Sequence, residues 1–297
     1  MTWQIIISLR IITAYVFTPL LLKKITGLPA RTRRLCWQFF FCAIFSFLFL
    51  LLFKENISVI NKFWLIIAGV GLINSFACYS YWRAIDISLS KTALFTQADD
   101  IIAILLGFLF LNEIKFLKPE LIFGLIICFG AASLLIFQSY KAKSTNLHGE
   151  NNFKLILWVA GFSLIYGIAA FLMRYFAITG ITFSTFLTSW YTGSFLGALI
   201  ILSFAGKNEA GKKLNLKSIS GVFILSLVIW LSMLLGYWTV KLVPITVFQP
   251  IFLVSELILP ALLGLYIFKE RKKLTFLEKI AFLLGLFGIL LIGFSFR

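Results

Sequence analysis

Ten apolar stretches run along the chain and are separated mostly by short polar segments. They cover residues 3–22, 35–53, 63–82, 91–111, 118–138, 154–174, 182–204, 218–238, 245–268 and 275–295. Each is close to the ~20 residues that an α-helix needs to cross a hydrocarbon core roughly 30 Å thick. The pattern predicts an all-α integral membrane protein with ten transmembrane helices. The composition agrees, because 61% of the 297 residues are hydrophobic and only 13% are charged.

The two halves of the chain carry related sequence patterns. The segment LLGFLFLNEIK, residues 105–115, matches LLGLYIFKERK, residues 262–272, at an offset of 157 residues. The same offset pairs Asp99 with Glu256. We therefore expect an acidic side chain at related places in the fourth and the ninth helix.

The longest polar break lies near the middle of the chain and divides the ten stretches into two sets of five. We expect a first five-helix repeat at 1–138, a polar linker at 139–153 and a second five-helix repeat at 154–297. Because five is odd, the two repeats would have opposite orientations in the membrane. Inverted repeats are a common plan of secondary transporters, whose binding site lies near the membrane midplane between the repeats.

The basic residues are distributed unevenly between the two sides of the predicted membrane. Lys and Arg number 19 in or beside the loops after odd-numbered helices, and 7 beside the other loops and the C-terminus. Since cytoplasmic loops are rich in Lys and Arg, we expect both termini outside the cytoplasm, in the cell (inner) membrane. This bias also accounts for the net charge of +16, so we expect no nucleic-acid partner.

Metal and cofactor chemistry has little support in the residue types. The four cysteines lie in or beside apolar stretches without a CxxC pair, and the only histidine is His148 in the polar break. A zinc site built by the protein needs several Cys or His ligands. We therefore expect no metal and no cofactor. The cysteines are Cys36, Cys42, Cys78 and Cys128.

Three acidic residues are predicted to lie inside the membrane. Asp99 and Asp100 fall near the middle of the fourth helix, and Glu256 falls in the ninth. An ionised acid at a helix centre costs roughly 2.5–3.5 kcal/mol, so these residues should face a polar cavity, pair with a cation or carry a proton. Adjacent helical residues point about 100° apart, so we expect only one of the two aspartates to face a given neighbour.

Arg10 is the only basic residue well inside a predicted helix, and we expect it to be the counter-charge of the acids. An ion pair that merely locks the helices together is the alternative. Three acids against one arginine leave an excess of negative charge. That excess suits a cationic or zwitterionic substrate, or a carboxyl group that exchanges the substrate for a proton.

Polar-tipped aromatic residues also fall inside the predicted helices. An aromatic wall beside acids can hold an organic cation by cation–π attraction worth about 0.5–2 kcal/mol for each ring, although ordinary helix packing explains any single ring equally well. Gln249, beside Pro250, is a candidate hydrogen-bonding partner of the substrate. Gly193 and Gly197 form a small-xxx-small pair that predicts close helix contact. The aromatic candidates are Tyr79, Trp190, Tyr191 and Trp230.

The ends of the two halves carry a family pattern. They read LLGFLFLNEIKFLKPELIFGLIICFGAASLLIF and LLGLYIFKERKKLTFLEKIAFLLGLFGILLIGF. Each has a helix with a Gly, a Glu at the helix end (Glu113 and Glu270) and a final helix that contains Gly. The chain thereby resembles EamA-type ten-helix members of the drug/metabolite transporter superfamily along essentially its whole length. The resemblance implies two five-helix repeats and the transport or export of a small metabolite.

These observations predict a secondary active transporter of a small polar metabolite, cationic or zwitterionic, such as an amino acid or an amine. It would work by alternating access on ion or substrate gradients, because the sequence contains no Walker motif. We do not expect an enzyme. The alternatives are a membrane-embedded enzyme that uses intramembrane carboxylates and a lipid flippase of the same fold. The expected partners are the substrate and the lipid bilayer; a monomer suffices, and a dimer remains open.

Overall fold

The computed structural model describes most of the chain, and the described part is built from helices without any strand. It comprises residues 3–53, 62–112, 119–120, 122–124, 126–127, 130–131, 133–134, 147–205, 214, 216–269 and 276–294. Glu113, Glu270 and Cys128 lie outside these residues, as does about half of the predicted fifth helix.

Seven helical segments of the described residues are long and apolar enough to cross a membrane, which confirms the all-α membrane class. They are formed by α1 (Trp3–Ile11) with η1 (Ile12–Phe17) and α2 (Thr18–Thr26), by α3 (Arg31–Phe53), by α4 (Lys62–Ile87), by α5 (Leu89–Phe95) with α6 (Gln97–Phe110), by α8 (Leu147–Ile178), by α9 (Phe183–Ala205) and by α10 (Leu216–Leu242). Three further elements follow: α11 (Ile245–Leu262), η4 (Leu263–Ile267) and α12 (Phe276–Phe294). Helix α8 begins inside the segment that we expected to be a linker.

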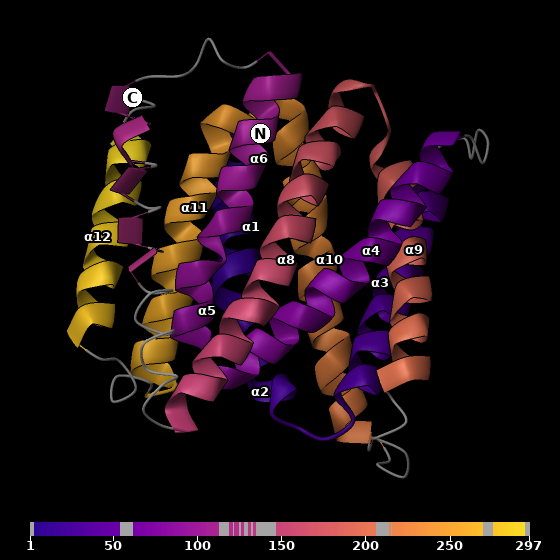
Figure 1. Cartoon of the computed structure of the whole chain (residues 1–297). Helices are drawn as coiled ribbons and strands as arrows, with labels where there is room; N and C mark the ends of the chain where they lie inside the picture. The colour runs from indigo at the N-terminus through magenta and orange to yellow at the C-terminus, as the bar shows by residue number, and fades with distance from the viewer. Residues whose placement is uncertain are drawn as a thin grey trace. The chain divides into compact units, whose positions relative to one another are not determined.

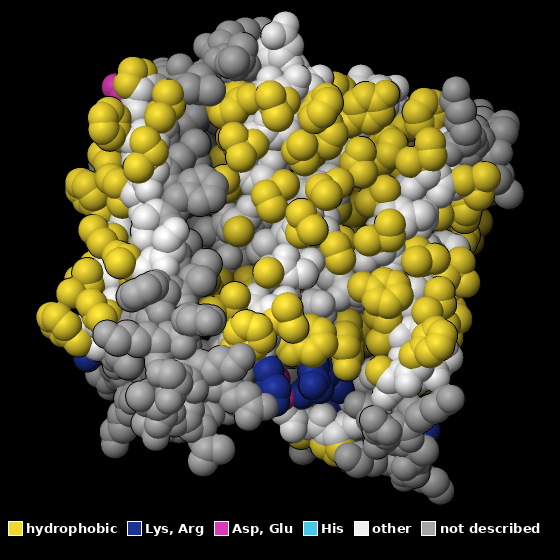
Figure 2. All heavy atoms as spheres, in the orientation of Figure 1, with side chains coloured by type: hydrophobic (Ala, Val, Ile, Leu, Met, Phe, Trp, Pro, Cys, Tyr) yellow, Lys and Arg dark blue, Asp and Glu magenta, His cyan; other side chains and the backbone are white. Residues whose placement is uncertain are grey.

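The surface of the described residues is apolar to an extent that water would not tolerate. Large hydrophobic side chains stand out from several helices, with Leu52, Leu109 and Phe204 each more than seven-tenths exposed. Figure 2 shows hydrophobic side chains spread over most of the described surface on one face. Continuous apolar surface of this kind marks contact with lipid rather than with water.

The chain divides into two compact units, each of which takes helices from both halves of the sequence. Unit 1 contains Met1–Trp82 and Leu172–Leu242, and unit 2 contains Arg83–Phe171 and Val243–Arg297. Helices α4 and α8 each contribute residues to both units.

Unit 1 is held together by closely packed helices. Helix α3 lies against α9 and α10 (Figure 1), and α1 packs on α10. Helices α4 and α9 approach so closely that a Cβ atom at Gly193 would overlap the backbone of Ala68, and one at Gly197 would overlap Leu72 and Ser75. The predicted small-xxx-small contact is confirmed, because only residues without a side chain fit at this crossing.

Unit 2 is organised around α11, which packs against α5, α6 and α12 (Figure 1). Residues of α4 and α8 form a small apolar core that contains Ala84, Leu155 and Val159. Helix α8 also approaches α6 closely, since a Cβ atom at Gly167 would lie 2.7 Å from the backbone oxygen of Asp99. The first turn of α6 is therefore confined between α8 and α11.

Candidate functional site

The predicted fourth membrane helix is divided at Thr96, a single residue between two helices, whose backbone angles are still helical (φ −65°, ψ −17°). Helix α5 ends at Phe95 and α6 begins at Gln97. At the break the N–H of Asp99 donates to the oxygen of Thr96, three residues earlier, at 2.9 Å. Asp99 and Asp100 thus stand in the first turn of the second half-helix. The two acids lie at the middle of the span Leu89–Phe110, as we expected, but the division of this span at Thr96 was not expected.

The position of the acids at this break has a physical reason. Backbone N–H groups at a helix start lack partners inside the helix, and the positive end of the helix dipole stabilises negative charge there. Thr96 and Asp99 have the T-x-x-D spacing that often begins helices, but the Thr96 hydroxyl donates to the oxygen of Ala93 instead. The Thr96 side chain itself makes no capping hydrogen bond.

The two acids of α6 meet the acid of α11. Carboxyl oxygens of Asp99, Asp100 and Glu256 all lie within 4.8 Å of one another. The three residues, which we call the carboxyl cluster, are 2%, 2% and 8% exposed. The cluster brings together Asp99 and Glu256, the two positions that the comparison of the sequence halves pairs.

Both aspartates face Glu256, which corrects the expectation that only one of them would face a given neighbour. The 100° between adjacent residues separates the Cβ directions. The carboxyl oxygens, however, lie at the ends of rotatable side chains, and the longer glutamate reaches the space between the two aspartates.

Gln249 completes the described site from about two turns before Glu256 on α11. It is 6% exposed, and its side-chain amide donates to an oxygen of Asp100. The predicted role of Gln249 beside the substrate stays a prediction, but its position at the acids is established. In contrast, Oδ1 of Asp99 is buried without a hydrogen-bond partner. One oxygen of the cluster therefore remains available to a ligand.

Arg10 belongs to unit 1, where it is 6% exposed. Its guanidinium donates to the backbone oxygen of Ser232 at 2.7 Å. Gly236 makes room for this group, because a Cβ atom there would overlap Nη1 of Arg10. The π-helix η1 begins two residues after Arg10, and such wide turns occur frequently at functional sites. Its role as the counter-charge of the acids stays a prediction.

Substitution of Gly236 directly tests the position of the Arg10 guanidinium against α10. In Gly236→Ala the new methyl group displaces the guanidinium and disturbs its bond to Ser232, and hydrogen bonds of charged groups contribute about 1.5–3 kcal/mol. We expect thermal unfolding of the purified protein to show a loss of roughly 1–3 kcal/mol. Gly221→Ala on the same helix is the control, because open space surrounds Gly221. Equal melting temperatures for the two variants would contradict this view of Arg10.

The four aromatic candidates all belong to unit 1. Trp190 and Tyr191 are each 2% exposed, and the Tyr191 hydroxyl donates to the oxygen of Ile229 at 3.4 Å. The indole N–H of Trp230 donates to Oγ of Ser46 at 3.0 Å, which gives Trp230 a packing role between α3 and α10. Tyr79 is half-buried on α4. Their predicted contact with a substrate stays a prediction.

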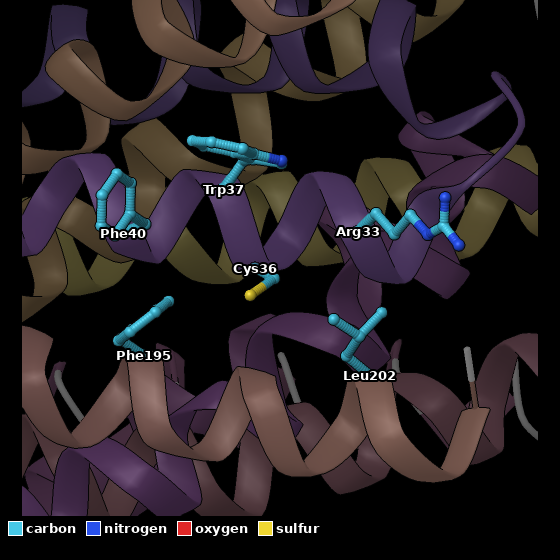
Figure 3. Close-up of a pocket in the computed structure, with 6 residues that line it drawn as sticks. All are labelled: Arg33, Cys36, Trp37, Phe40, Phe195 and Leu202. Carbon is cyan, nitrogen blue, oxygen red and sulfur yellow. The ribbon is translucent and has the colours of Figure 1, made fainter. Parts of the chain in front are cut away.

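A groove lies between α3 and α9 in unit 1. Figure 3 shows Cys36 on α3 pointing toward Phe195 and Leu202 on α9, with Arg33 at one end. This groove encloses about 380 Å³, and Trp37 and Phe40 complete its lining. Since its lining is apolar apart from Arg33, it suits a hydrocarbon chain better than a polar metabolite.

Comparisons with known proteins add the fold alone. No family model matches the chain, and no curated protein matches it. One solved structure, described only as a crystal structure of a protein, aligns with 99% of this chain and 96% of its own length. The TM-score is 0.61 at 14% sequence identity. The chain thus shares its fold with a solved protein from which nothing about substrates follows.

Proposed function

We propose that the protein is a secondary active transporter of a small polar metabolite, cationic or zwitterionic, which it moves by alternating access. The observation that carries the proposal is the carboxyl cluster at the break between α5 and α6. Charged groups at membrane depth are costly and mark substrate or ion pathways.

The negative charge of the carboxyl cluster favours a ligand that carries a positively charged group. Three carboxyl groups within 4.8 Å concentrate negative charge at one buried point. Their mutual repulsion is relieved when a cation or a proton lies among them. An ammonium group of an amino acid or an amine supplies such a charge, with N–H donors for the carboxyl oxygens.

We also propose that the chain is an EamA-type member of the drug/metabolite transporter superfamily, with two inverted five-helix repeats. The paired end motifs support this, as does the meeting of Asp99 with Glu256. The protein would lie in the cell (inner) membrane with both termini outside the cytoplasm, as the Lys and Arg bias favours. Reporter fusions to each terminus test this orientation.

The ligand class is tested by a thermal-shift screen of the purified protein. Amino acids, polyamines, quaternary amines, nucleotides and sugar phosphates are added at pH 6 and pH 8. A ligand that binds the folded state stabilises it by RT ln(1 + [L]/Kd). We expect a cationic or zwitterionic class to raise the melting temperature of the wild type and not that of Glu256→Gln. Stabilisation by anionic ligands alone, or equal shifts in the variant, would overturn the proposal.

A lipid flippase of the same fold is the second candidate, and the groove between α3 and α9 is the observation that favours it. Its apolar lining fits an acyl chain, and Arg33 at one end fits a phosphate. Vesicles with a fluorescent phospholipid distinguish the candidates. Lipid translocation that is lost in Leu202→Trp, which fills the groove, and retained in Glu256→Gln would favour the flippase.

A further inference from the structure

The carboxyl cluster has the dimensions of a metal-ion site. Its three oxygens lie within 4.8 Å of one another, so by simple geometry each is within about 2.8 Å of a common centre. Calcium takes oxygen ligands at about 2.3–2.6 Å in flexible geometry. Small side-chain adjustments therefore bring all three oxygens to coordination distance. Magnesium, at about 2.0–2.1 Å and with strict octahedral geometry, fits this spacing less well.

One oxygen of the carboxyl cluster is buried and has no hydrogen-bond partner in the described structure. Oδ1 of Asp99 is buried and has no hydrogen-bond partner, although the residue is only 2% exposed. A buried carboxylate oxygen without a partner is costly, and a cation is the ligand that such an oxygen binds best. A second oxygen of the same helical turn, Oε1 of Gln97, is likewise buried without a hydrogen-bond partner.

The ligand set and its charge select the kind of ion. The cluster offers carboxylate oxygens alone, which prefer hard cations such as calcium and manganese(II) to soft, thiolate-binding metals. A monovalent ion would leave up to two negative charges buried, whereas a divalent ion leaves at most one. The side-chain amide of Gln249 on α11 donates to Asp100 on α6. Because Glu256 also lies on α11, an ion at the centre of the carboxyl cluster would connect α6 to α11.

We propose that the carboxyl cluster binds one hard divalent cation of the size of calcium. This inference rests on the proposed function, because it assigns an inorganic ion to the carboxyl cluster that we propose as the binding site of the transported metabolite. An inorganic ion would then occupy the cluster in at least one step of the transport cycle. The arrangement of α6 relative to α11 would depend on that ion.

The experiment uses the full chain, purified in detergent and freed of metals with a chelator. Manganese(II) is titrated while electron paramagnetic resonance follows the free ion, and calcium is then added to displace it. Melting temperatures are measured with calcium, magnesium and sodium at equal ionic strength. The variants are Asp99→Asn, Glu256→Gln and the control Asp86→Asn, which neutralises an exposed aspartate at the end of α4.

We expect one manganese ion per chain, displaced by calcium, in the wild type and in Asp86→Asn. Calcium should raise their melting temperature by about 5 °C at saturating concentration, and magnesium and sodium should raise it less. Asp99→Asn and Glu256→Gln should each weaken manganese binding at least tenfold. Two variants are used so that a folding defect in one, seen as lost helical circular dichroism, leaves the other to decide.

The outcomes separate this inference from the proposed function. Absence of saturable manganese binding, or equal binding by the wild type and both cluster variants, overturns the metal site. If a cationic metabolite alone stabilises the wild type, the proposed function stands and the metal site falls. If the metal binds through the cluster and no metabolite class does, the metal site stands and the proposed metabolite falls.

Discussion

Asp99→Asn is expected to stabilise the protein without ligand and to weaken ligand binding by about 30-fold or more. Truncating or neutralising one partner of a buried charge pair costs about 2–5 kcal/mol of binding, and every 1.4 kcal/mol is tenfold. The same change relieves repulsion within the cluster, so the unliganded protein should gain roughly 1–3 kcal/mol. Thermal unfolding with and without the ligand found in the screen measures both effects.

Asp86→Asn is the matched control, because it makes the same chemical change at an exposed position of unit 2. It should leave both the melting temperature and the ligand response close to those of the wild type. A large loss of stability in Asp99→Asn would contradict this account of the cluster. It would mean that Asp99 is a structural partner of a cation within the fold.

Gly71→Ala is expected to cause a large loss of stability. A Cβ atom at Gly71 would overlap the backbone oxygen of Trp190, so α4 and α9 must separate to make room. Overpacking of this kind costs about 1–3 kcal/mol and sometimes more. The displaced segment of α9 contains Trp190 and Tyr191. The variant therefore also tests whether the position of these two residues is important for stability. Unfolding in detergent and helical circular dichroism measure the effect.

Gly69→Ala, two residues earlier on the same helix, provides the comparison. Open space surrounds Gly69, and alanine is the better helix former by about 1 kcal/mol in water. Gly69→Ala should therefore be neutral or slightly stabilising. Similar melting temperatures for the two variants would show that α4 and α9 do not approach each other as closely as described.

The sequence predicts the helices well and their interruptions poorly. Hydropathy places α3 and α9 within a few residues of their observed ends, because lipid sets a minimum length for the apolar stretch of a spanning helix. It does not predict the break at Thr96 or the π-helix η1. Those irregularities depend on which backbone groups find partners in neighbouring helices, and that information is spread over residues far apart in the chain.

Part of the candidate site could also be predicted from the sequence. The offset between the two halves paired Asp99 with Glu256, and the structure brings both into one cluster. The convergence of Asp100 on the same point was not predictable, because it depends on side-chain reach rather than on helical periodicity. The hydrogen bond from Trp230 to Ser46 was also missed, since it joins two helices distant in sequence.

The central claim, that the carboxyl cluster binds the charge of a transported ligand, is tested most directly by counterflow. Wild-type protein in proteoliposomes loaded with the unlabelled ligand from the screen should accumulate labelled ligand from outside. Asp99→Asn and Glu256→Gln should not accumulate it, while Asp86→Asn should match the wild type. Accumulation by both cluster variants at the wild-type rate would contradict the account, because the ligand would then cross the membrane without the carboxyl cluster.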